Sequence, residues 1–292
     1  MSNDRSAPVL VLGVTGKTGA AVARALLARG VAVRGVSRGA GDGGRAGARP
    51  MQDQPGTGAP AGVQVAIADP VTGVGMAEAV RGCRAVYHLA PNLSADEVPM
   101  LEHTIAACRS GGVRRVVFHS VMHPWAPSMA HHVRKAEAED VLRRSGLAWT
   151  VLQPAAYHQN LLGGLREGVL SAPYSTGRPF TNVDLRDVAE AAAIVLGDDA
   201  HVYGTYELAG PERLDLVAMA EQAARVLGRP VVARRGTAPT SADPRETAEL
   251  AAMFDHYDHH GFTGSPFVLR ALLGRRPRSW AQFLFDTAAE GK

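Results

Sequence analysis

The sequence predicts an α/β protein in which a doubly wound parallel sheet is followed by a smaller C-terminal α/β domain. Short apolar runs rich in Val alternate with helical patterns as far as residue 154, which is typical of a parallel sheet with right-handed crossovers. A glycine-rich turn joins the first apolar run to the first helical pattern. After residue 154 the alternation breaks, and the remaining helices predict a second, smaller domain.

The first predicted strand, Val9–Leu12, leads into three glycines and then a helical pattern from Ala20 to Leu27. Strand, glycine turn and helix in this order are the context in which such glycines indicate dinucleotide binding. Gly13 permits the tight turn, Gly16 lets the backbone approach a pyrophosphate, and Gly19 lets the helix pack close to the strand. The N–H groups and the partial positive charge of the helix N-terminus favour phosphates.

Two alternatives compete for this turn. It could simply connect a core strand to a core helix without binding anything. It could also be a phosphate loop for a nucleoside triphosphate, because Gly16-Lys17-Thr18 matches the end of that motif. The motif requires a glycine five residues before Gly16, where this chain has Val11 inside the strand. The triphosphate alternative is therefore disfavoured.

The end of the second predicted strand, 31–37, indicates which dinucleotide is preferred. An acidic residue there would accept the ribose 2′-hydroxyl of NAD, but the strand ends in Ser37-Arg38, with no acid before Asp42. A guanidinium suits a 2′-phosphate through charge-assisted hydrogen bonds. The sequence therefore favours NADP(H), unless Arg38 is only a surface arginine.

The other predicted elements follow in order. Further strands are expected at 63–68, 85–90, 113–119, 147–152 and 205–208, and helices at 71–81, 95–110, 129–145, 185–196 (with Asp184 as N-cap), 214–227, 244–259 and 279–289. Residues 39–62, rich in Gly, Pro and Ala, predict a flexible loop, and residues 155–182 predict loops with one helix. We expect residues 1–154 with about 181–205 to form the dinucleotide domain, and 155–180 with 206–292 to form a substrate domain.

Composition narrows the class of protein. Of 292 residues, 46% are hydrophobic and 20% charged, as in soluble globular proteins, and no apolar run approaches the length of a membrane span. The N-terminus lacks a signal-peptide layout, and two cysteines suit a reducing cytoplasm. The net charge is only +3 and the sequence has no long basic run, so we expect no nucleic-acid partner. The oligomeric state is left open.

Several segments resemble the NmrA-like branch of the atypical short-chain dehydrogenases/reductases. They are the stretch VLGVTGKTGAAVARALL, VSR after the second strand, HSV at Ser120, the block HHVRKAEAEDVLRRSGLAWTVLQPAAYHQNL from His131 to Leu161, NVDLRDVAEAAAIVL and YELAGPE. The resemblance covers nearly the whole chain and implies a Rossmann domain with a small C-terminal substrate domain. It also implies these cofactor contacts: Gly13, Thr15, Gly16, Thr18, Gly19, Ser37, Arg38, Asp69, Ala90, Lys135, Gln153, Pro154 and Ala155.

The same resemblance defines a candidate catalytic set of Ser120, His131 and Lys135. The wider superfamily uses a Ser, a Tyr and a Lys four residues after the Tyr, and residues four apart share a helix face. Ser120 and Lys135 fit this set, but His131 occupies the Tyr position, which puts Tyr-driven carbonyl reduction in doubt. The chain holds only three lysines, at 17, 135 and 292, although Lys135 could also be an ordinary surface lysine.

Further residues predict a substrate pocket beside this set. An imidazole could donate a proton to a reduced substrate, or could merely shape the pocket. The predicted pocket residues are His123, Trp125, His132, Tyr157, His158 and Asn160. A second polar cluster at 255–260 has metal-ligand residue types but lacks a metalloprotease pattern, so we expect no metal site.

The sequence thus predicts an NADPH-dependent reductase of a small organic substrate such as a quinone, an enone or an aromatic polyketide-type ketone. Lys135 would orient the ribose, and Ser120 or His131 would polarise or protonate the substrate. The missing Tyr keeps two alternatives open. One is a non-catalytic NADP(H) redox sensor, and the other is a biosynthetic enzyme that performs a non-redox step.

Overall fold

The computed structural model describes residues 6–38 and 58–290, and these residues cluster into two compact units. The first unit holds the described residues up to 153 together with 189–206, and the second holds 154–188 and 207–290. The sequence predicted that 181–205 would belong to the first domain, whereas in the structure this unit receives 189–206. Among the described residues, no helix is both long and apolar enough to cross a membrane.

A seven-stranded sheet in the order β3–β2–β1–β4–β5–β6–β8 forms the centre of the first unit. The pairs from β3 to β6 are parallel, with Val9 opposite both Val33 and Ala85. The order reverses between β1 and β4, and such a reversal opens the crevice where α/β sheets bind ligands. The strands are β1 (Val9–Val11), β2 (Val33–Ser37), β3 (Gln64–Ile67), β4 (Ala85–His88), β5 (Arg115–His119), β6 (Ala148–Pro154) and β8 (Gly204–Leu208).

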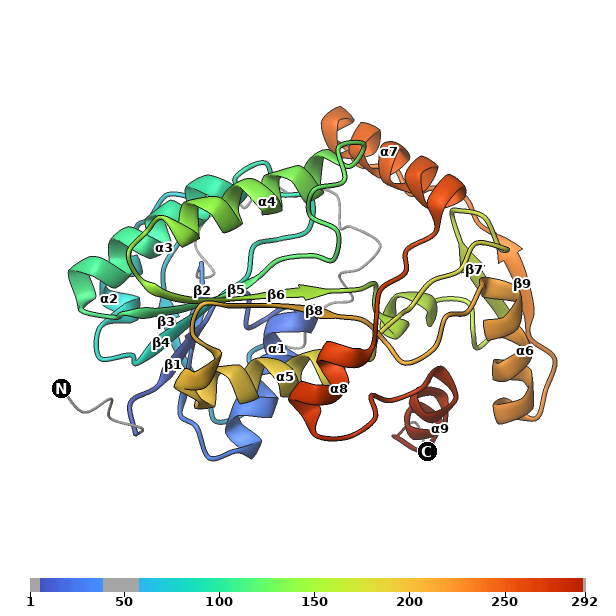
Figure 1. The fold of residues 1–292 in the computed structure, drawn as a ribbon, viewed down its shortest axis with the longest axis horizontal. Helices are drawn as coiled ribbons and strands as arrows, with labels where there is room; N and C mark the ends of the chain where they lie inside the picture. The colour runs from blue at the N-terminus through green and yellow to red at the C-terminus, as the bar shows by residue number, and fades with distance from the viewer. Residues whose placement is uncertain (1–5, 39–57, 291–292) are drawn as a thin grey trace. The chain divides into compact units, whose positions relative to one another are not determined.

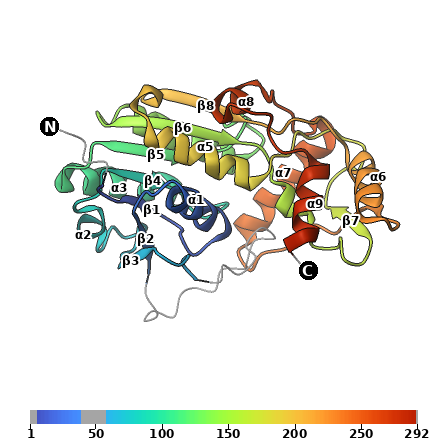
Figure 2. The ribbon, with the colours of Figure 1, turned by 90° about the horizontal axis from the view of Figure 1, so that it is seen from below.

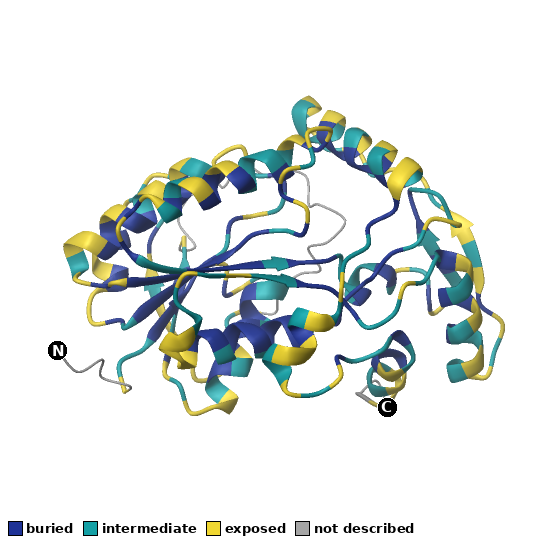
Figure 3. Ribbon diagram, viewed as in Figure 1, coloured by how far each residue is buried: buried dark blue, intermediate teal, exposed yellow. Residues whose placement is uncertain are grey.

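Helices cover both faces of this sheet (Figures 1 and 2). On one face lie α1 (Lys17–Ala28) and α5 (Leu185–Gly197), and on the other α2 (Met76–Val80), α3 (Glu97–Gly111) and α4 (Ala130–Arg143). The buried side of each helix faces the strands (Figure 3). Phe118, Leu101 and Leu142 belong to the core cluster of the α2–α4 face and are fully buried, and each such side chain contributes about 1.5–3 kcal/mol. The sheet is therefore a rigid platform for the loops at its carboxyl edge.

The second unit combines a two-stranded parallel sheet with helices. Its sheet pairs β7 (Val169–Ala172) with β9 (Val232–Arg235). Trp280 and Phe283 pack with Met219 in its core, and the indole N–H of Trp280 donates to the carbonyl oxygen of Met219 at 2.9 Å. Its helices are the short 3₁₀ helix η1 (His158–Leu161), α6 (Leu216–Leu227), α7 (Pro244–His260), α8 (Phe267–Leu273) and α9 (Trp280–Glu290).

The structure confirms the predicted α/β class and most of the elements, with some corrections. Helix α2 does not begin at residue 71, because Gly73 and Gly75 have φ of +77° and +76° and a helix cannot pass through left-handed backbone. The prediction missed β7, β9 and α8. The two strands have only four residues each and β9 is largely exposed, so they carry almost no apolar pattern. Most of the predicted loop at 39–62 lies outside the described residues.

Candidate functional site

The glycine turn ends at a helix whose N-terminus has no side-chain cap. Gly16 is the N-cap of α1, makes no side-chain cap, and is followed by no acidic residue in the first turn. Gly13 is exposed with φ of +63°, and a Cβ on Gly19 would lie 2.2 Å from the carbonyl oxygen of Gly13. These features fit the phosphates of a dinucleotide, because the dipole of a helix N-terminus without an acidic first turn favours an anion. Two more predicted contacts lie in this stretch, Thr15, which is exposed, and Thr18, which is half-buried.

Other predicted cofactor residues follow the carboxyl ends of neighbouring strands. Ser37 ends β2 and Arg38 follows it, exposed and without an ion pair to any described residue. Ala90 lies just beyond β4 and is buried. Asp69 lies beyond β3, but its carboxylate accepts hydrogen bonds from Val71 N at 2.9 Å and from the Thr72 hydroxyl at 3.1 Å. The Asp69 side chain therefore closes its own turn.

Two loops at this edge contain non-glycine residues in left-handed backbone. Leu93, after β4, has φ of +58°, and His123, after β5, has φ of +55°. Such a conformation costs about 1–3 kcal/mol and persists where surrounding contacts enforce it. The first turns of α4 supply those contacts, because Arg134 Nε donates to Ser94 O at 3.0 Å and His132 Nδ1 to His123 O at 3.0 Å. Helix α4 is thus fastened to both loops.

Lys135 lies on α4 directly after Arg134. Its ammonium donates to Glu97 Oε1 at 2.8 Å and to the carbonyl oxygen of His119 at 3.1 Å. Only 13% of the Lys135 side chain and 3% of the Glu97 side chain are exposed, and the ammonium lies 5.3 Å from the centre of the Phe118 ring. An ammonium has three N–H donors, so one has no partner among the described residues.

The Ser120 hydroxyl is engaged in a second buried network. Ser120 Oγ donates to Glu139 Oε1 at 2.5 Å, and Gln153 Nε2 donates to the same oxygen at 2.8 Å. Arg143 pairs with the other oxygen of Glu139 at 2.9 Å. Because its hydrogen is directed at Glu139, Ser120 keeps only lone pairs, with which it can accept but not donate.

His131, which occupies the superfamily's Tyr position, lies one helical turn before Lys135. Burial, followed by the nearby His132, Arg134 and Lys135, lowers the pKa of His131 to about 2, so the imidazole is neutral near pH 7. Its Nδ1 is buried without a hydrogen-bond partner. The His131 and His132 rings lie 4.5 Å apart in an edge-on arrangement. His132 is itself buried and holds the His123 carbonyl, while Trp125 in the same loop is 67% exposed.

More buried polar groups lie beneath this edge. The Tyr87 hydroxyl is 2.5 Å from His119 Nδ1, and both side chains are buried, so Tyr87 cannot replace the missing Tyr at the surface of the site. His88 Nδ1 contacts the Thr104 hydroxyl at 3.0 Å, and its Nε2 has no partner. Burial, reinforced by the charge of Lys135, lowers the pKa of His88 and of His119 to about 3. The two histidines beneath Lys135 are therefore uncharged near pH 7.

The remaining predicted site residues belong to the second unit. His158 is buried, with its ring 5.2 Å from the Trp280 ring and 5.4 Å from the Phe283 ring, so it is part of the core of that unit. Tyr157 forms a β-bridge with Val183. Asn160, predicted for the substrate pocket, is half-buried in η1. The predicted cofactor contacts Pro154 and Ala155 are both buried, and the N–H of Ala155 donates to Leu208 O at 3.1 Å.

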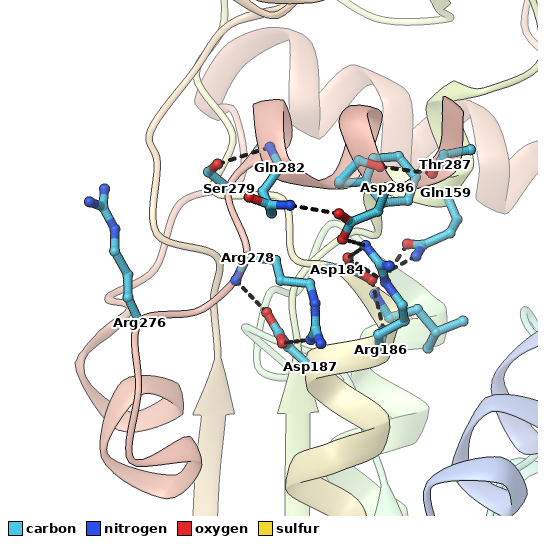
Figure 4. Close-up of polar contacts among 12 residues, drawn as sticks. Gln159, Asp184, Arg186, Asp187, Arg276, Arg278, Ser279, Gln282, Asp286 and Thr287 are labelled. Carbon is cyan, nitrogen blue, oxygen red and sulfur yellow. Dashed lines mark hydrogen bonds and ion pairs between the residues drawn. The ribbon is translucent and has the colours of Figure 1, made fainter. Parts of the chain in front are cut away.

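The second unit also holds a closed acidic cluster at the start of α5 (Figure 4). Asp184 caps this helix as predicted, accepting from Arg186 N at 2.8 Å, and it also binds the Arg186 guanidinium and the Gln159 amide. Asp187 accepts from Arg275 at 2.8 Å and from both the backbone N–H, at 2.6 Å, and the guanidinium of Arg278. Both carboxylates are fully buried, so we assign them a structural role.

Sequence reasoning missed Glu97 and Glu139, which organise the two networks of the first unit. Glu139 lies in the run AEAED, whose other acids, Glu137 and Asp140, are exposed. Its spacing of four residues from Lys135 was the available signal, because it places both side chains on one face of α4.

At 255–260, where no metal site was predicted, the His256 and His260 rings lie 4.7 Å apart. No group of three potential ligands in the described part of the chain is arranged to hold a metal.

Comparison with known proteins places the chain in a family. The NmrA-like family matches residues 5–279, so the protein belongs to that family. The chain is 35% identical over 159 residues to a (4-alkanoyl-5-oxo-2,5-dihydrofuran-3-yl)methyl phosphate reductase of Streptomyces griseus, a match that spans 52% of this chain and 55% of that protein. It is 29% identical over 229 residues to an NAD(P)H azoreductase of Xenophilus azovorans, which covers 76% of this chain and 75% of the relative.

Solved structures share the fold. An NADPH-dependent quinone oxidoreductase of Escherichia coli, solved with NADPH, has a TM-score of 0.75 at 20% identity, covering 96% of this chain and 99% of its own. A triphenylmethane reductase of Citrobacter, solved with NADP(H), has a TM-score of 0.74 at 19% identity and covers 96% and 99%. The azoreductase, the quinone oxidoreductase and the triphenylmethane reductase are thus reductases that use or bind NAD(P)H, and a nicotinamide dinucleotide is the cofactor that these relatives support.

Proposed function

We propose that the protein is an NADPH-dependent reductase of a small conjugated acceptor such as a quinone, an enone or an aromatic ketone. The observation that carries the proposal is Lys135, held at the carboxyl edge of the sheet with one N–H still available. The uncapped helix α1 supports a dinucleotide at the same edge. The names of the relatives, an azoreductase and a dihydrofuranone phosphate reductase, agree with a reductase of small molecules.

The residues of this edge take separate roles in the proposal. When bound, the dinucleotide would supply a hydride to the substrate. The turn at Gly13 and Gly16 would hold the phosphates, Arg38 the 2′-phosphate, and Lys135 the ribose hydroxyls. The second unit would bind the substrate.

The site favours acceptors that form a stabilised anion. Ser120 directs its hydrogen at Glu139, and His131 is neutral, so neither offers a strong acid. A neutral imidazole near a helix N-terminus can still donate a hydrogen bond to a developing oxyanion. Such a hydrogen bond is sufficient for a quinone or an enone, because the negative charge formed on reduction spreads over the conjugated system.

A non-catalytic redox sensor is the second candidate. The engaged Ser120 and the missing Tyr favour it, because they remove the usual proton donors while leaving the phosphate-binding turn intact. A sensor would bind NADP⁺ and NADPH with different affinities and would consume NADPH with no acceptor.

Fluorescence titration with NADPH and with NADH, followed by NADPH oxidation with quinones and aromatic ketones, tests the proposal. We expect tighter binding of NADPH and turnover with at least one quinone. Arg38→Ala should weaken NADPH binding about 10- to 100-fold, the effect of lost charged hydrogen bonds, without changing NADH binding. Arg24→Ala, at an exposed position on α1, is the matched control. Binding of neither dinucleotide would refute both candidates, and tight binding without turnover would favour the sensor.

A further inference from the structure

Glu97 supplies the negative charge that Lys135 meets at the edge of the sheet. Glu97 is the first residue of α3, directly after the strained loop that follows β4. A helix N-terminus stabilises a carboxylate in its first turn. Within the described residues, Glu97 is the only carboxylate paired with Lys135, and the other neighbours of the ammonium are the His119 carbonyl and the Phe118 ring.

The charge and the direction of the ammonium both depend on this pair. A buried ammonium without a counter-charge is strongly disfavoured, and the side chains of His88 and His119 beneath it are neutral. The two acceptors, on α3 and β5, fix two of the three N–H directions, and the tetrahedral geometry of the ammonium then fixes the third. No such constraint exists for a lysine with a single partner, which rotates about its last bond.

We propose that Glu97 is a positioning residue that fixes the charged Lys135 ammonium so that its third N–H binds the ribose hydroxyls of the dinucleotide. This inference rests on the proposed function, since it names how the same site holds its cofactor. Glu97 itself touches neither cofactor nor substrate in this role. Its contribution passes through Lys135.

The pair also predicts a dependence on pH. Burial raises the pKa of Glu97 above its ordinary value, while Lys135 and then Arg134, both from α4, act in the opposite direction. His88 and His119, on β4 and β5, stay neutral because their pKa values are about 3. Glu97 therefore takes up a proton at a higher pH than an ordinary carboxyl. Lys135 then loses its partner, and NADPH binding should weaken as the pH falls through that region.

The small number of lysines permits a direct test in the protein without cofactor. With ¹⁵N-labelled lysine, three side-chain nitrogen signals are expected, from residues 17, 135 and 292, and Lys17→Arg and Lys292→Arg assign them. In the unmodified protein the Lys135 signal should shift as Glu97 titrates. Glu97→Gln, which keeps the shape but not the charge, should abolish that inflection.

The same variants are then titrated with NADPH between pH 5 and 8. Glu97→Gln should raise the Kd at least about tenfold and remove its dependence on acid pH, while Glu97→Asp should retain the inflection but bind weakly because its carboxylate is shorter. Glu102→Gln, at an exposed position on α3, should change neither measurement. Equal NADPH affinity in Glu97→Gln and the unmodified protein would overturn the inference alone. Failure of the unmodified protein to bind either dinucleotide would overturn the proposed function and the inference with it.

Discussion

Two buried sets of polar groups, the acidic cluster of the second unit and the groups around Lys135 in the first unit, differ in how many of their polar atoms have partners. In the second unit every oxygen of Asp184 and Asp187 accepts from an arginine, an amide or the backbone (Figure 4). At the sheet edge of the first unit, Lys135 keeps one N–H without a partner and His131 keeps a buried Nδ1 without one. We call the cluster of the second unit the closed network, and the groups around Lys135 and His131 in the first unit the open network.

We therefore assign the closed network to the stability of the fold and propose a ligand-binding role for the open one. Buried polar groups are expensive unless they are paired, so a closed network is what a fold requires. In an open network some buried polar atoms lack a hydrogen-bond partner, and such atoms are expected where a bound ligand supplies the partner. The open network also coincides with the two strained loops at Leu93 and His123, whereas the closed one joins the start of α5 to the segment before α9.

The largest effect is expected from breaking the closed network. Asp187→Asn leaves the Arg275 and Arg278 guanidiniums without their counter-charge, which should lower the free energy of unfolding by roughly 3 kcal/mol. Urea denaturation measures the change. Asp255→Asn, whose carboxylate is 76% exposed in the same unit, should change stability by less than about 0.5 kcal/mol. An unaltered urea midpoint for Asp187→Asn would mean that the cluster stabilises nothing.

A smaller effect for each pH unit is expected from acid at the open network. His131 has an ordinary pKa of about 6.5 when unfolded and about 2 when folded, so the unfolded chain binds the proton first. Its stabilising contribution is complete above pH 6.5 and is lost at about 1.4 kcal/mol per pH unit below it. His131→Asn should reduce the slope of the free energy of unfolding against pH, measured below pH 6.5, by that amount. The control His259→Asn, at an exposed position, should leave this slope unchanged. Equal slopes in all three proteins would contradict the neutral, buried imidazole.

The sequence allowed the sheet and its glycine turn to be predicted because their signals are local. An apolar strand, Gly13, Gly16 and an amphipathic helix lie within about twenty consecutive residues, and each has a fixed structural meaning. Asp184 was predictable for the same reason, since an acid directly before a helix acts as a cap. Strands β7 and β9 carry no comparable signal, because each has only four residues and β9 is largely exposed.

The partners within the site could not be predicted from local patterns. Glu97 reaches Lys135 across 38 positions of sequence, and Ser120 reaches Glu139 across 19, so only the folded arrangement shows these contacts. The family resemblance identified Ser120 and Lys135 as candidates, but it did not reveal that the Ser120 hydroxyl is already engaged. The burial of His158 among aromatic rings was hidden for the same reason, since Trp280 and Phe283 are distant in sequence.

The most direct test of the central claim, that the open network is the functional site, is NADPH oxidation by Lys135→Met compared with the unmodified protein. With a quinone that the unmodified protein reduces, we expect turnover to fall about 100-fold or more, within the range typical of positioned catalytic groups. The free energy of unfolding should fall less than in Asp187→Asn, because Glu97, whose pKa burial already raises, can take up a proton. Turnover in Lys135→Met equal to that of the unmodified protein would contradict the account.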